Sequence, residues 1–122
     1  MRRAAIVLFV LIVACSKREE KAQNAAVTGG GDSDRGRQLV QEYGCTACHN
    51  IPGVKGPKGM VGPSLDHMGS RTYIAGKFQN NAQNMIKWLQ NPQGMDPTNA
   101  MPNLGVTPAD SRDMTAFLFT LK

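Results

Sequence analysis

Apolar side chains recur at helical spacing in three segments of this 122-residue chain. The first segment predicts a helix over residues 34–43, behind a Ser33 N-cap and ending at Gly44. Its apolar face holds Leu39, Val40 and Tyr43. A glycine inside a helix costs about 1 kcal/mol relative to alanine. We therefore expect Gly36 to mark a close crossing with the last helix, at Phe117.

Two further helices are predicted, each with a clear start signal. Asn81 caps a helix over residues 82–90, and Pro92 prevents its continuation. The last helix begins with the capping box Thr-Pro-Ala-Asp at 107–110, with proline at its first position. The apolar residues of these two helices are Met85, Ile86, Trp88, Leu89, Met114, Phe117, Leu118 and Leu121.

The segments between the helices are rich in glycine and proline and show no sustained alternation of the kind typical of strands. Loops of this length are unusual in a compact domain unless they are functional. The folded part, residues 33–122, also contains few aromatic side chains from which to build a core. We therefore predict an all-α domain whose loops enclose a large apolar group.

The N-terminus has the pattern of an export signal. Arg2 and Arg3 precede an apolar run over residues 4–13, too short to span a bilayer but long enough for a signal-peptide core. The run ends in Ile-Val-Ala-Cys, which resembles the lipobox of bacterial lipoproteins. We expect removal of a signal peptide at 1–14 and diacylation of Cys15, which would anchor the chain to a bacterial membrane, facing the periplasm or cell exterior. The alternative is a small-residue cleavage site that happens to contain cysteine.

Residues 15–32 are predicted to form a flexible tether behind the lipidated cysteine, because they are polar and lead into three glycines at 29–31. Removal of residues 1–14 would lower the formal charge from +5 to +3, leaving 12 basic and 9 acidic residues. No basic stretch is interleaved with aromatic residues, so nucleic-acid binding has no support.

The pentapeptide Cys45-Thr-Ala-Cys48-His49 carries the chemistry of this chain. This pattern attaches haem c: the two thiols form thioethers with the haem vinyl groups, and the histidine supplies the first axial ligand of the iron. One covalent haem c would be the large apolar group that the loops enclose.

Other interpretations of this pentapeptide stay open. A structural zinc site needs four ligands, but only Cys15 and His67 remain. A thioredoxin-like dithiol needs a preceding strand, whereas the residues before Cys45 predict a helix. A plain disulfide would leave His49 without a role.

A methionine is the expected second axial ligand. Met101 lies in an irregular segment before the last helix, where Pro102 stiffens the chain and no helix packing requires a thioether. His67 and Met60 are weaker candidates. Met85 and Met114 fall on apolar helix faces, where methionine more often fills the core, and Met95 follows a glycine in another loop.

Several motifs in a fixed order resemble class I c-type cytochromes, most closely the cytochrome c domain fused to subunit II of some haem-copper oxidases. Besides the pentapeptide, they are Gly-Pro-Ser-Leu at 62–65, Arg-Thr-Tyr-Ile-Ala-Gly at 71–76, Trp-Leu-Gln-Asn-Pro at 88–92, Met-Pro at 101–102, and the last helix. The resemblance implies a cytochrome c fold of three to four helices and long loops around one haem c.

The resemblance also implies roles for individual residues. His49 and Met101 would be the axial ligands, and the Pro63 carbonyl would accept the imidazole N–H. The expected cofactor-binding residues are Cys45, Cys48, His49, Pro63, Leu65, Arg71, Tyr73, Trp88 and Met101. Arg71, Tyr73 and Trp88 would lie near a haem propionate; the alternative is a surface arginine and ordinary core aromatics.

The chain departs from the fused form because it has no copper-binding domain. We therefore expect a free-standing, membrane-tethered carrier that passes electrons between redox proteins such as a terminal oxidase or another cytochrome, with no catalytic residue. A weakly positive face is compatible with such docking. The rivals are a haem enzyme or a gas or peroxide sensor with a displaceable distal ligand, and a lipoprotein without haem.

Overall fold

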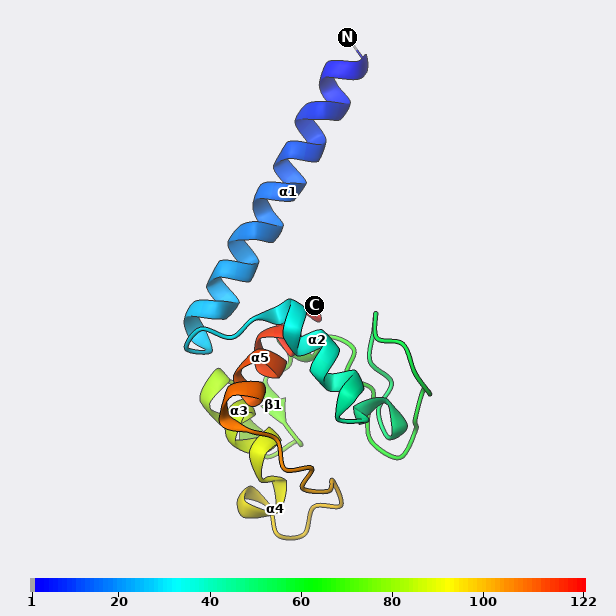
Figure 1. Cartoon of the computed structure of the whole chain (residues 1–122), viewed down its shortest axis with the longest axis vertical. Coiled ribbons are helices and arrows are strands. Elements are labelled where there is room, and N and C mark those ends of the chain that lie inside the picture. Colours follow the sequence, from blue (N-terminus) through cyan, green and yellow to red (C-terminus); the bar gives the residue numbers. More distant parts are fainter. Residues whose placement is uncertain (1) are drawn as a thin grey trace.

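The computed structural model describes the backbone of residues 2–122 and the side chains of residues 13–122. A long first helix extends away from a compact helical domain (Figure 1). The elements are, in chain order, α1 (Arg2–Val27), α2 (Ser33–Glu42), the 3₁₀ turn η1 (Cys45–Ala47), the 3₁₀ turn η2 (Met68–Ser70), β1 (Tyr73–Ile74), β2 (Phe78–Gln79), α3 (Ala82–Gln90), α4 (Pro92–Met95) and α5 (Pro108–Leu118). The predicted all-α class is confirmed.

The segment expected to be a flexible tether is helical as far as Val27, so that expectation was wrong for residues 16–27. The reason is local: this segment is rich in alanine, glutamate and lysine, all good helix formers, and contains no glycine or proline. The left-handed Gly29 and Gly30 follow the helix end. Side chains up to residue 12 lie outside the described residues, and with them most of the predicted signal peptide. Within the described part of the chain, no helix is long and apolar enough to cross a membrane.

The N-cap of α2 is Asp32 and not Ser33, which is the first residue of the helix. The Asp32 carboxylate accepts hydrogen bonds from the backbone N–H groups of Asp34 and Arg35, at 2.9 and 3.3 Å. A carboxylate caps as well as a hydroxyl and also complements the helix dipole. The helix ends where predicted, because Gly44 adopts φ +73°.

The predicted crossing at Gly36 is confirmed, but its partner is different. A Cβ atom on Gly36 would lie 1.9 Å from the carbonyl oxygen of Asp113 and 2.9 Å from the backbone N of Met114. Phe117, the expected partner, lies one turn further along α5. The helices approach so closely that backbone meets backbone, and side chains cannot intervene there.

Ion pairs and a hydrogen bond fasten α2 to α5 beside this crossing. Arg35 lies 2.8 Å from Asp110 and 2.5 Å from Asp113. The Tyr43 hydroxyl donates to Asp110 at 2.8 Å. Asp110 therefore does not complete the predicted capping box; only the Thr107 hydroxyl accepts from the Asp110 N–H, at 3.1 Å.

The other predicted caps are present. The Asn81 side chain accepts from the N–H of Asn84 at 2.9 Å, and Pro108 opens α5. Leu121 lies beyond the end of α5 and packs partly buried against the core. The buried hydrophobic core consists of Leu39, Val40, Ile51, Met68, Ile74, Met85, Trp88, Leu89, Val106, Met114, Phe117 and Leu118.

A two-residue antiparallel hairpin, not expected from the sequence, pairs Tyr73 with Gln79 and Ile74 with Phe78. Its turn places Ala75 and Gly76 at φ +50° and +68°. Strands of two residues are too short to produce a visible alternation.

Candidate functional site

One cavity of about 510 Å³ is lined by every residue that the sequence predicted to bind the cofactor. Its walls come from α2, η1, the loop at 61–65, the hairpin, α3, the segment before α5, and α5 itself. The further lining is largely apolar and includes Val40, Ile51, Met68, Ile74, Met85, Leu89, Met114 and Leu118. The volume lies within the range of about 300–1,000 Å³ typical of ligand and cofactor pockets.

The turn η1 directs both cysteines and the histidine to this cavity. The N–H groups of Cys48 and His49 both donate to the Cys45 carbonyl, at 3.2 and 3.0 Å, and the N–H of Ala47 donates to the carbonyl of Gly44 at 3.0 Å. Gly44 must be left-handed to start this turn straight after α2. The N-terminal end of the pentapeptide is thereby fixed to the end of α2, a packed helix.

The thiols do not have the character of a redox dithiol. Burial raises the pKa of the Cys45 thiol to about 11, so it is neutral at physiological pH. A reactive dithiol would need the opposite shift. Cys45 and Cys48 are both free. Among the side chains at 13–122, no group of three or more His, Cys, Asp or Glu residues could hold a metal ion, so the zinc interpretation finds no support there.

The His49 imidazole is oriented by its contact with Pro63, where Nδ1 lies 2.7 Å from the carbonyl oxygen. A carbonyl oxygen only accepts, so Nδ1 carries the proton and Nε2 keeps its lone pair for a metal. This is the contact that the resemblance implied. It fixes both the tautomer and the direction of the ring.

Gly62, whose role sequence reasoning missed, packs against the same imidazole. A Cβ atom there would lie 2.4 Å from His49 Cε1 and 2.7 Å from Nδ1. The loop that carries Gly62 returns along the pentapeptide: the N–H of Gly62 donates to the carbonyl of Cys48 at 2.8 Å, and that of Gly59 to Thr46 at 3.0 Å. The only signal in the sequence was the Gly-Pro pair, which does not reveal a contact across the loop.

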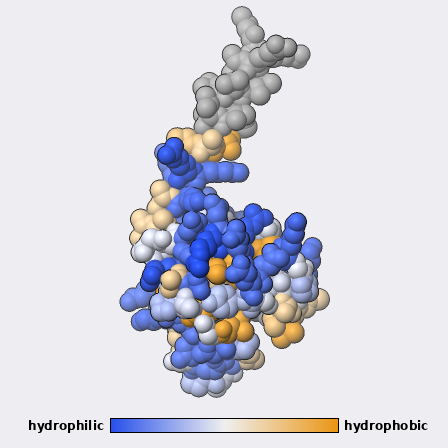
Figure 2. Space-filling view, in the orientation of Figure 1, coloured by the Kyte–Doolittle hydropathy of each residue, from blue (hydrophilic) through white to orange (hydrophobic). Residues whose placement is uncertain are grey.

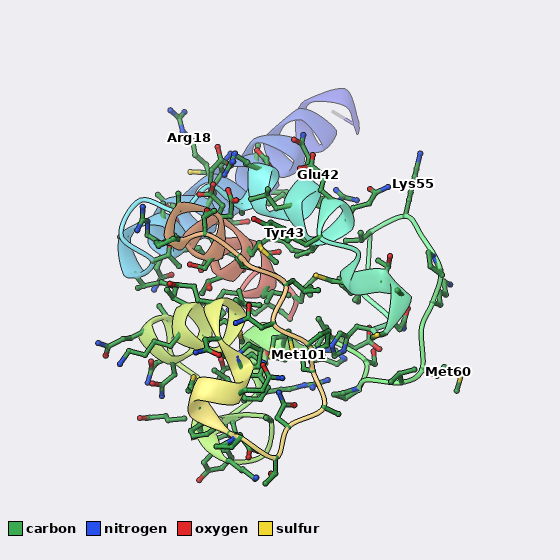
Figure 3. The ribbon with its side chains drawn as sticks, turned by 60° about the horizontal axis from the view of Figure 1, so that its bottom comes forward. Arg18, Glu42, Tyr43, Lys55, Met60 and Met101 are labelled. Atoms are coloured by element: carbon green, nitrogen blue, oxygen red, sulfur yellow. The ribbon has the colours of Figure 1, made fainter. Side chains whose placement is uncertain are left out.

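Met101 is the candidate distal ligand that the structure brings to the cavity. Figure 3 shows Met101 near the middle of the molecule and Met60 at its edge, pointing outward. Met60 is 93% exposed, and neither it nor His67 lines the cavity. Met68, Met85 and Met114 do line the cavity, but they are buried within the core, as expected of packing residues.

Arg71, Tyr73 and Trp88 lie on the cavity wall. Nη2 of Arg71 donates to the carbonyl oxygens of Ser64 and Asp66, both at 2.7 Å, which ties the loop after Pro63 to the hairpin. Tyr73 is 56% exposed at the rim, whereas Trp88 is buried and packs against Phe78. Their role toward a propionate stays a prediction.

Asn80 is a second residue that sequence reasoning missed. Its side-chain amide donates to the carbonyls of Met68 and Arg71, at 2.8 and 2.9 Å. It thereby holds the chain between η2 and β1 in place behind the cavity wall. Leu65, by contrast, was expected at the cofactor and is partly buried on the cavity wall.

The donor set fits haem c. One apolar cavity collects two thiols, a thioether and an imidazole whose Nδ1 contacts a carbonyl so that Nε2 is the nitrogen left for the iron, and it is of a size suited to a cofactor. The alternatives from the sequence fit less well, because neither zinc nor a dithiol would need so large an apolar cavity.

Comparison with known proteins gives the same result. The family model described as cytochrome c matches residues 33–122. Cytochrome c oxidase subunit 2 of Alkalihalophilus pseudofirmus is 33% identical over 91 residues, which are 74% of this chain and 26% of that protein. The corresponding subunits of Bacillus subtilis and Bacillus sp. strain PS3 are each 33% identical, over 69 and 89 residues, which are 55% and 70% of this chain and 19% and 25% of those proteins.

The chain thus spans about a quarter or less of the length of these relatives. The family model, in contrast, covers more than half of the chain, and it starts at the first residue of α2. With the pentapeptide and its cavity, this match establishes the cofactor as covalent haem c. The chain belongs to the cytochrome c family, as a class I c-type cytochrome.

Proposed function

We propose that this cytochrome is a membrane-tethered carrier that moves single electrons between redox proteins. When bound, haem c supplies a one-electron couple between ferric and ferrous iron. The observation that carries the proposal is that His49 and Met101 line the same cavity as the two cysteines. With an imidazole and a thioether on the iron, no position is open to a substrate, which favours electron transfer over catalysis.

The residues around the cofactor have holding and shielding roles in this proposal. Cys45 and Cys48 attach it, Pro63 orients His49, and the apolar lining excludes water. A thioether opposite histidine favours the ferrous state relative to two histidines. No side chain needs to act as acid, base or nucleophile.

The similarity to subunits of cytochrome c oxidases supports a respiratory partner, such as a terminal oxidase or another cytochrome. Those proteins are about four times as long as the matched segment, so the similarity concerns their cytochrome c region and not a whole oxidase subunit. The proposed role of this chain is donor or acceptor to such a complex.

The tethering part of the proposal rests on Cys15, which is exposed on α1. From Cys15 to the helix end at Val27 there are twelve steps along α1, which rise about 18 Å at 1.5 Å per step. A lipid on Cys15 would therefore hold the domain at a set distance from a bacterial membrane, on its periplasmic or outer face. A single acyl chain binds a membrane only marginally, whereas two acyl chains anchor stably.

The carrier is tested with protein matured in a host that makes c-type cytochromes. We expect an iron–sulfur charge-transfer band in the ferric protein and no binding of carbon monoxide to the ferrous protein. Met101→Ala should remove the band and open the iron to carbon monoxide, whereas Met60→Ala, at a fully outward position, should change neither. Rapid carbon monoxide binding to the unaltered protein would instead favour an enzyme or sensor.

The anchor is tested separately by fractionation. Cys15→Ser should move the protein from the membrane to the soluble fraction, while Ser16→Ala, its neighbour, should leave it bound. Equal membrane binding by both variants would contradict the lipid anchor without affecting the carrier.

A further inference from the structure

Met101 lies in a segment whose next residues face solvent, namely Asn103, Leu104 and Gly105, while its neighbours Ala100 and Pro102 line the cavity with it. Such a segment has few buried contacts of its own to fix its backbone. Something outside the segment must therefore hold Met101 toward the cavity.

We propose that Gln93 is the positioning residue that keeps the Met101 thioether at the iron, an inference that rests on Met101 being the distal ligand. Nε2 of Gln93 donates a close hydrogen bond to the Met101 carbonyl and a longer one, 3.4 Å, to the carbonyl of Asn99. Gln93 does not line the cavity, so it acts only through the backbone that it holds.

The Asn99 side chain completes the arrangement from within the segment. Its Oδ1 accepts from the N–H of Met101 at 3.1 Å, and its Nδ2 donates to the Met101 carbonyl at 3.4 Å. Asn99 moves with the segment, however, whereas Gln93 belongs to α4. Gln93 is thus the link between the Met101 backbone and a separate element.

The element that presents Gln93 is itself fixed at both ends. Asn91 caps α4 by accepting from the N–H of Gly94 at 3.0 Å, and Pro92 at its first position is buried. At the other end, Asp96 forms an ion pair with Lys77 of the hairpin turn at 2.6 Å. The Gln93 amide therefore contacts the Met101 carbonyl from an element whose own position is fixed at both ends.

The chemistry of the contact demands a donor. Both partners of Nε2 are carbonyl oxygens, which only accept, so a carboxylate of the same shape would face two acceptors and repel them. Without the amide, water can solvate the Met101 carbonyl and the exposed segment is free to withdraw the thioether. Loss of a hydrogen bond of this kind shifts such an equilibrium by about tenfold.

The test compares Gln93→Leu and Gln93→Glu with Gln41→Leu, a matched change on the exposed face of α2. In the haem-loaded protein at neutral pH, we expect the thioether to be withdrawn in an about tenfold larger fraction of both Gln93 variants. Both variants should therefore bind carbon monoxide detectably and lose the iron–sulfur band at lower temperature. Gln41→Leu should behave as the unaltered protein.

The Glu variant adds a signature that a general loss of stability would not give. As the pH falls and the carboxyl of Gln93→Glu becomes protonated, its O–H can donate to the Met101 carbonyl, so the band should strengthen. The unaltered protein and Gln93→Leu should show no such recovery over the same range. If Gln93→Leu does not fold, the pH dependence of the band in Gln93→Glu tests the positioning role of Gln93 by itself.

Unchanged carbon monoxide binding and band stability in both Gln93 variants, with no recovery in acid, would overturn the proposal. This failure is distinguishable from a failure of the ligand assignment, in which Met101→Ala itself would keep the band.

Discussion

Gly36 and Asp113 are in direct backbone contact: a Cβ atom at position 36 would lie 1.9 Å from the Asp113 carbonyl oxygen. This contact sets the separation of α2 and α5. Because α2 runs directly into the haem-binding pentapeptide, and both α2 and α5 line the cavity, the contact also helps to set the shape of the site. The contribution of this contact to the free energy of unfolding can be measured.

Gly36→Ala should destabilise the protein by about 2 kcal/mol. Alanine improves helix propensity by about 1 kcal/mol, but the methyl group meets backbone that cannot rotate away, and such overpacking costs about 1–3 kcal/mol or more. The free energy of unfolding from chemical denaturation checks this. Gln38→Ala, at an exposed position of α2, serves as the control. A stabilised Gly36→Ala variant would show that the helices can separate.

Gly62→Ala should loosen the proximal ligand. The added methyl group would lie 2.4 Å from His49 Cε1, so the ring must turn and lose its contact with the Pro63 carbonyl. A less well oriented imidazole is displaced by protons more easily, and the acid transition of the visible spectrum should move to higher pH. Met60→Ala, in the same loop at a side chain that is 93% exposed and does not line the cavity, should leave this transition in place. An unchanged midpoint in Gly62→Ala would mean that the ring has room to adapt.

Tyr43→Phe should lower stability by about 1 kcal/mol near neutral pH, with a smaller loss in acid. The Tyr43 hydroxyl, and next to it Arg35, hold the pKa of Asp110 below its usual range. A depressed carboxyl pKa contributes stability that is present above the unfolded value of about 3.9 and is lost as the pH falls through the folded value. Denaturation of both proteins between pH 3 and 7 checks this. An equal difference at both ends would contradict the linkage.

The same pair makes an alkaline prediction. The hydrogen bond to Asp110 is the main cause that raises the pKa of Tyr43, so its contribution is present below the usual tyrosine value of about 10 and is lost as the pH rises through the folded value. The stability of the unaltered protein should therefore fall toward that of Tyr43→Phe above pH 10. Denaturation curves in this range decide it.

The last two turns of α1 should hold a fixed position against the domain. Lys21 lies 2.5 Å from Asp34, Thr28 is buried, and Gly31 packs so tightly that a Cβ atom would lie 2.4 Å from the Arg112 carbonyl oxygen. In the view of Figure 2, the compact domain below α1 presents a mostly hydrophilic surface with scattered hydrophobic patches. We expect a spin label at position 18, in a Cys15→Ser background, to give a narrow distribution of distances to the ferric iron.

Gly31→Ala should broaden that distribution, because the methyl group forces the connection off the Arg112 backbone. Ala22→Ser, at an exposed position of α1 outside the pocket between this helix and the domain, should leave it narrow. A broad distribution in the unaltered protein would instead support the flexible tether expected from the sequence. The ion pair of Lys21 is exposed and contributes little to stability, so Lys21→Glu should have a smaller effect than Gly31→Ala.

Local signals in the sequence were sufficient wherever a short segment decides the outcome by itself. The caps at Asn81 and Thr107, the helix end at Gly44 and the haem-binding pentapeptide all depend on residues within a few positions of one another. The composition of residues 16–27 also favoured a helix, although the polar character of this segment and the glycines after it led to the expectation of a flexible tether. The helix there follows from ordinary propensity.

The tertiary structure alone decided which residues meet across the chain. Sequence spacing predicted that Gly36 crosses another helix, but the contact at Asp113 depends on how two helices seat, which no local pattern encodes. Gly62 against His49, and Gln93 against the Met101 carbonyl, are likewise contacts between segments brought together by folding. The sequence by itself therefore determined the cofactor and most of its candidate ligands, and the packing of backbone on backbone decided how those ligands are held.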